Sequence, residues 1–85
     1  MEREEFMAKC QEMVNKFGAR VILSVYERTV RMANHIFDFG KDESVTTDIL
    51  CDDIGDMYIG LMCMQIMLHA DPDKIENRIV AQLAS

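Results

Sequence analysis

Three aspartates at the start of an apolar segment are the residues best suited to chemistry in this 85-residue chain: Asp52, Asp53 and Asp56. Side chains three or four residues apart share one side of a helix, so these carboxylates can converge. Carboxylates that lie this close repel one another and require a cation, which could be a metal or an arginine. Mg²⁺ suits such a group because it takes hard oxygen ligands and is often shared with substrate phosphates. The alternative is a solvated acidic helix start that the helix dipole favours.

The elements that position these aspartates are predicted to be helices. Gly18, Gly40 and Pro72 divide the chain into four segments with helical periodicity, and no convincing strand pair lies between them. The predicted helices span residues 2–17, 19–38, 45–69 and 72–83. We therefore expect a single all-α domain in which two long antiparallel helices are joined by the Gly40 turn.

Two helix starts carry side chains that can cap them. Ser44 or Thr46 is available as the N-cap of the third helix. Asp71 precedes Pro72, and proline favours the first position of a helix, so the fourth helix is expected to begin there.

The third helix predicts self-association. From Met57 to Leu68 it is apolar on nearly every face, and a helix of that kind must be covered on all sides. Three other short helices can hardly cover it within one chain, so we expect an oligomeric bundle, a homodimer or tetramer. Ile59, Gly60 and Met64 are predicted to lie near the subunit interface, since a glycine inside a helix allows another backbone to approach closely.

Composition excludes several classes of function. The formal net charge of −6 disfavours direct binding to nucleic-acid phosphates, although it suits a basic protein partner. The apolar run in the third helix is shorter than the roughly 20 residues that span a bilayer, and the N-terminus does not resemble a signal peptide. Three cysteines without a C-x-x-C pair indicate reduced thiols, so we expect a cytoplasmic protein.

The histidines and the cysteine beside the aspartates give weaker signals. His35 and His69 have no partner at metal-ligand spacing, so capping or surface roles are expected for them. Cys51 has no neighbouring base in the sequence that would activate it as a nucleophile.

The order of the elements resembles that of the MazG-like, all-α nucleoside-triphosphate pyrophosphohydrolases. A Lys-Phe-Gly turn leads into a helix with Glu27, and a polar turn then leads into a helix with Asp53-x-x-Asp56. The resemblance covers about residues 14–69. It implies that acidic side chains from the two helices bind Mg²⁺, which holds a triphosphate while water cleaves it to a monophosphate and pyrophosphate.

This sequence matches the two acidic motifs of the family to different extents. Asp53 stands where the second family motif has glutamate, and Asp56 matches its aspartate. Glu27 matches the first carboxylate of the other motif, but Arg28 and Arg31 stand where its remaining carboxylates would be. Guanidinium groups cannot ligate Mg²⁺ and would repel it. We therefore predict that an ion-pair network of Arg28, Arg31, Asp53 and Asp56 has replaced the metal, so that no cofactor is expected.

Three functions follow as hypotheses. The first is a degenerate MazG-like protein, weakly active or inactive, with a residual nucleotide-binding or protein-interaction role and no assigned catalytic residue. The second is an active Mg²⁺-dependent pyrophosphohydrolase whose atypical metal site consists of Glu27, Asp52, Asp53 and Asp56. The third is a small acidic interaction or inhibitor protein that acts on a basic partner.

Overall fold

A computed structural model describes residues 1–84 as an all-helical chain, with no strand in that range. This confirms the predicted all-α class and the presence of four helices. The helices are α1 (Arg3–Phe17), α2 (Arg20–Asp38), α3 (Thr47–Met67) and α4 (Pro72–Ala84).

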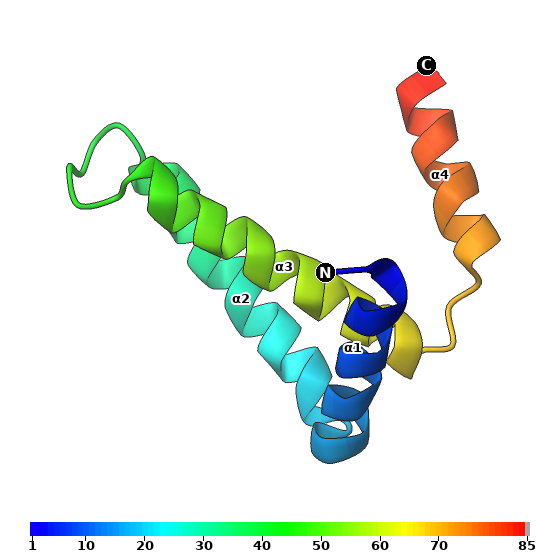
Figure 1. The fold of residues 1–85 in the computed structure, drawn as a ribbon. Helices are drawn as coiled ribbons and strands as arrows, with labels where there is room; N and C mark the ends of the chain where they lie inside the picture. Colours follow the sequence, from blue (N-terminus) through cyan, green and yellow to red (C-terminus); the bar gives the residue numbers. More distant parts are fainter. Residues whose placement is uncertain (85) are drawn as a thin grey trace.

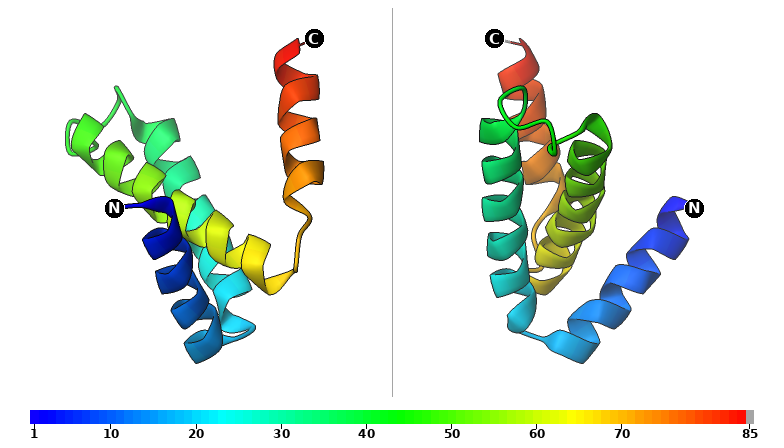
Figure 2. Two further views of the ribbon diagram at one scale, coloured as in Figure 1. Left: turned by 45° about the vertical axis from the view of Figure 1, so that its right-hand side comes forward. Right: turned by 90° about the vertical axis from the view of Figure 1, so that its left-hand side faces the viewer.

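The two long helices, α2 and α3, run antiparallel and pack along their length, while α1 crosses them at the end remote from the connecting loop (Figures 1 and 2). The loop turns at Gly40, whose φ of 86° suits glycine. In the same loop the Asp42 carboxylate accepts hydrogen bonds from the backbone N–H and the hydroxyl of Ser44. These bonds lower the pKa of Asp42 because they stabilise its charged form.

The helix ends follow the capping residues in the sequence. Gly18 ends α1 with a φ of 56°, and its N–H donates to the Val14 carbonyl. Thr46 caps α3, because its hydroxyl accepts from the Ile49 N–H at 3.3 Å. Asp71 accepts from the N–H two residues later at 2.9 Å, and α4 begins at Pro72. Thr46, rather than Ser44, is therefore the cap of α3.

The core is small and lies where α1, α2 and α3 meet. Cys10, Val21 and Cys63 form its buried centre. Half-buried apolar side chains from α1 and α3 pack against it: Phe6, Met13, Val14, Ile59, Met62, Ile66 and Met67.

Gly60 lies where side chains of α2 pack closely on α3. A Cβ added there would lie 3.2 Å from a Val25 methyl and 3.7 Å from a nitrogen of the Arg28 guanidinium. The close neighbours of this glycine are therefore side chains of α2 in the same chain. At Gly55 a Cβ would meet nothing within 4 Å.

The fourth helix differs from the expected bundle. It packs against none of α1, α2 and α3, and it projects away from them (Figure 1). Ile75, Ile79, Val80 and Leu83 are exposed along it, the last at 82%. The core of a single chain is formed by α1, α2 and α3 and does not include α4, and the predicted oligomeric bundle stays a prediction.

The chain is open for its size. Its radius of gyration is 14.9 Å, against about 12 Å for a compact chain of this length. Its accessible surface of 6686 Å² exceeds that of a compact 9.8 kDa monomer by roughly 1,500 Å². Exposed large apolar side chains occur on all four helices. Within residues 1–84, no helix has the length and apolar character needed to cross a bilayer.

The three free cysteines should differ sharply in reactivity. Burial, together with the neighbouring Cys63 thiol, raises the pKa of Cys10 to about 11, whereas Cys51 is exposed. Since the thiolate is the reactive form, we expect only Cys51 to react quickly with Ellman's reagent at pH 8 in the folded protein. All three should react after denaturation, and Cys51→Ser should abolish the fast phase. Two fast thiols in the native protein would contradict this packing of α1 on α3.

Candidate functional site between α2 and α3

Asp53 is the buried carboxylate of the predicted acidic site, with 5% of its surface exposed. Its partner is His35 on α2, whose Nδ1 lies 2.6 Å from Asp53 Oδ2. An ionised carboxylate only accepts hydrogen bonds, so the imidazole Nδ1–H is the donor. A buried carboxylate without such a partner would be strongly destabilising, and the antiparallel packing of α2 on α3 supplies the partner.

Asp56 lies about one turn further along α3 and pairs with Arg31. The Arg31 Nη1 is 3.5 Å from Asp56 Oδ2, and the two side chains are 52% and 40% exposed. Solvent screens a pair of this kind, so it contributes at most about 1 kcal/mol to stability. It nevertheless places a permanent positive charge beside the carboxylate that the family resemblance assigns to Mg²⁺.

Arg28 reaches the same turn of α3 but contacts the main chain. Its Nη1 donates to the backbone carbonyl of Asp56 at 3.2 Å. The predicted four-residue network is thus divided in the structure: Arg31 contacts the Asp56 carboxylate, Arg28 contacts the Asp56 backbone, and Asp53 pairs with His35.

The structure also allows the implied metal site to be tested against its donors. Glu27 and Asp52 are exposed, and the two remaining carboxylates already have the partners described above. Among residues 1–84, no three side chains of His, Cys, Asp or Glu come together in an arrangement that could hold a metal ion. The donor set in this conformation therefore does not fit Mg²⁺.

His35 is the site residue that sequence reasoning missed. Nothing in its local sequence identifies it, but Ser44 lies midway between His35 and Asp53 in the chain. In an antiparallel helix pair, residues equally distant from the turn face each other. That register would have placed His35 opposite Asp53 once the position of the loop was known.

The two polar pairs should contribute very differently to stability. His35→Ala leaves the Asp53 carboxylate buried without a partner, and we expect the free energy of unfolding to fall by about 1.5–3 kcal/mol. Arg31→Ala should cost less than about 1 kcal/mol, since its pair is exposed. Urea denaturation at pH 7 measures both changes.

Loss of packing at position 35 could also destabilise the protein, so a double variant serves as the control. Asp53→Asn added to His35→Ala removes the buried charge and should recover part of the loss. The assigned role of the buried pair would be contradicted if the double variant lost as much free energy of unfolding as the two single changes together. Equal losses for His35→Ala and Arg31→Ala would also contradict it.

The comparisons with known proteins leave the chain without an assigned family. No family model, curated protein or solved structure matches it.

Proposed function

We propose that this protein is a MazG-like helical domain that has lost Mg²⁺-dependent hydrolysis and acts as a homo-oligomeric binding protein. The observation that carries the proposal is the buried pair between His35 and Asp53. It uses the most buried acidic side chain of the site for packing α2 on α3, where the family resemblance implies a metal ligand.

The arginines of α2 support the same conclusion. Arg31 holds a positive charge 3.5 Å from Asp56, and Arg28 binds the backbone of that residue. A divalent cation at this place would meet two guanidinium groups that stay protonated at all physiological pH values. The hydrogen bond with His35 and the ion pair with Arg31 thus take the place of metal ligation on Asp53 and Asp56.

Self-association is supported by the surface that one chain leaves uncovered. The roughly 1,500 Å² of surplus surface exceeds the roughly 800 Å² per partner that a standard protein interface buries. The 13-residue α4 has no helix packed against it, and an isolated helix of that length is marginal in water. A second copy that covers α4 and the exposed side of α3 explains how both are stabilised. Of the predicted contacts on α3, Met64 is still proposed for the subunit interface, whereas Ile59 packs on the core of its own chain and Gly60 packs against α2.

The lost activity is tested with the purified wild-type protein. We expect no pyrophosphate release from the common ribo- and deoxyribonucleoside triphosphates with Mg²⁺ or Mn²⁺ present. Isothermal titration with Mg²⁺ should likewise give no binding heat, because the aspartates are already paired. Pyrophosphate release that Asp53→Asn or Asp56→Asn abolishes would overturn the proposal and favour the active enzyme.

Self-association is tested by placing a charge on the apolar side of α4. Ile79→Asp should raise the dissociation constant of the oligomer at least about tenfold, because an aspartate buried in an apolar contact loses its hydration. Light scattering after gel filtration should show a mass that shifts toward 9.8 kDa. Ala81→Asp adds the same charge to the opposite side of α4 and should leave the mass unchanged. A wild-type monomer, or equal effects of both variants, would contradict this arrangement.

A further inference from the structure

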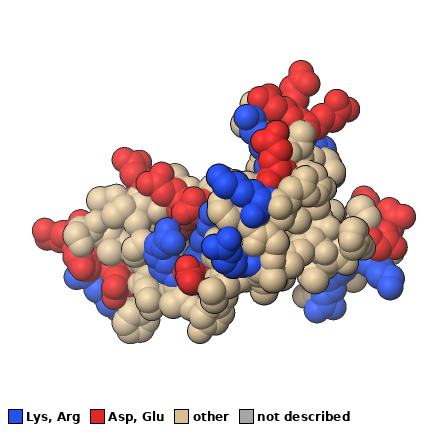
Figure 3. Space-filling model, turned by 90° about the horizontal axis from the view of Figure 1, so that it is seen from below, with Lys and Arg blue, Asp and Glu red and all other residues tan. Residues whose placement is uncertain are grey.

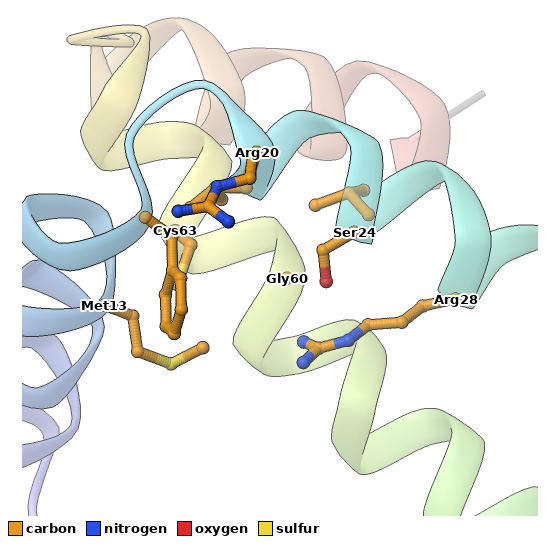
Figure 4. A pocket seen from close by; sticks show the side chains of 9 residues that line it. Met13, Arg20, Ser24, Arg28, Gly60 and Cys63 are labelled. Carbon is orange, nitrogen blue, oxygen red and sulfur yellow. The ribbon is translucent and has the colours of Figure 1, made fainter.

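A pocket of about 370 Å³ lies beside the α2–α3 contact, and Arg28 lies between it and the acidic site. It is formed by the C-terminal half of α1, the first turns of α2 and the middle of α3 around Gly60 (Figure 4). Its volume lies within the range of about 300–1,000 Å³ that is typical of small-molecule sites.

The polar side of this pocket is positively charged. Arg20 and Arg28 both line it, and among the residues that the structure describes there, none is an aspartate or glutamate. Within residues 1–84, neither arginine forms an ion pair with a carboxylate. The pocket is thus positively charged although the whole chain has a formal net charge of −6. Figure 3 shows a group of basic side chains near the middle of one face, with acidic side chains beside it and charged side chains of both signs toward the ends.

The polar groups of the pocket are Arg20, Ser24 and Arg28, which all come from α2. Figure 4 shows the two guanidinium groups on either side of Gly60, with the Ser24 hydroxyl between them. The Arg28 guanidinium is held in place because it donates to the Asp56 carbonyl at 3.2 Å, which leaves its other N–H groups available. Two guanidiniums and a hydroxyl are suited to the oxygens of a phosphate group.

The other side of the pocket is apolar. Val21 and Val25 of α2 and the Phe17 ring at the end of α1 line it. The Arg20 guanidinium lies 5.9 Å from the centre of the Phe17 ring, a distance that allows a cation–π interaction. A ligand with only a phosphate group would leave this apolar wall uncovered.

We infer that this pocket binds a small organic phosphate, with the phosphate held by Arg20, Ser24 and Arg28 and an apolar or aromatic group against Phe17, Val21 and Val25. The inference rests on the binding role in the proposed function and gives it a place and a ligand class. Since the pocket contains neither Asp53 nor Asp56, the loss of hydrolysis and the binding of a phosphate can be disproved separately. A chain that hydrolyses nucleoside triphosphates could still have this site, and an inactive one could lack it.

The experiment is a titration of the ¹⁵N-labelled wild-type protein with phenyl phosphate, followed by two-dimensional NMR at low salt. Amide shifts should concentrate around Ser24 and Gly60. Inorganic phosphate and phenol, which each carry half of the ligand chemistry, should bind at least about tenfold more weakly than phenyl phosphate.

Two charge-matched variants locate the site. Arg20→Gln removes one guanidinium from an exposed position that the core does not need, and it should weaken phenyl phosphate binding by roughly tenfold or more. Arg78→Gln makes the same charge change on α4, outside the pocket, and should leave binding unchanged. The inference is overturned if the wild-type protein shows no saturable shifts, if both variants weaken binding equally, or if inorganic phosphate binds as well as phenyl phosphate.

Discussion

The antiparallel packing of α2 on α3 brings together the polar groups of the candidate site, which come from both helices. Gly60 leaves room for the Val25 side chain, because a Cβ added at Gly60 would lie 3.2 Å from a Val25 methyl. Nearer the loop, the same helix pair holds His35 Nδ1 2.6 Å from Asp53 Oδ2. It also sets Arg28 across from the Asp56 carbonyl, between the acidic site and the cationic pocket. One helix pair therefore provides the polar groups of both sites.

Much of the fold could be predicted because the ends of its helices are determined by residues close to them in the sequence. Gly18, Thr46 and Pro72 each satisfy or remove a backbone hydrogen-bonding group at a helix end, and such effects act over a few residues. The pairing of Asp53 with His35 could not be predicted that way, since it depends on the register of two helices separated by a loop. The position of α4 depends on surfaces outside its own segment, so the sequence pattern predicted its start at Pro72 but not where it would lie.

The arginines of α2 explain how an acidic protein can still contain a cationic region. Arg31 compensates a carboxylate, whereas Arg20 and Arg28 have no acidic partner within residues 1–84. The net charge of the chain therefore describes its outer surface and its ends better than it describes the pocket. Electrostatic arguments from composition alone would have directed attention to basic partners and away from anionic ligands.

The position of α4, apart from the other helices, affects how easily the protein can be degraded in a cell. With no helix of its own chain against it, α4 can unfold without disturbing the contact between α2 and α3. If the proposed self-association holds, a copy without a partner would expose Ile75, Ile79 and Leu83 on a helix that unfolds easily, which is the kind of segment that proteases cut. Assembly would then protect the protein from degradation, and its abundance would depend on its concentration rather than on synthesis alone.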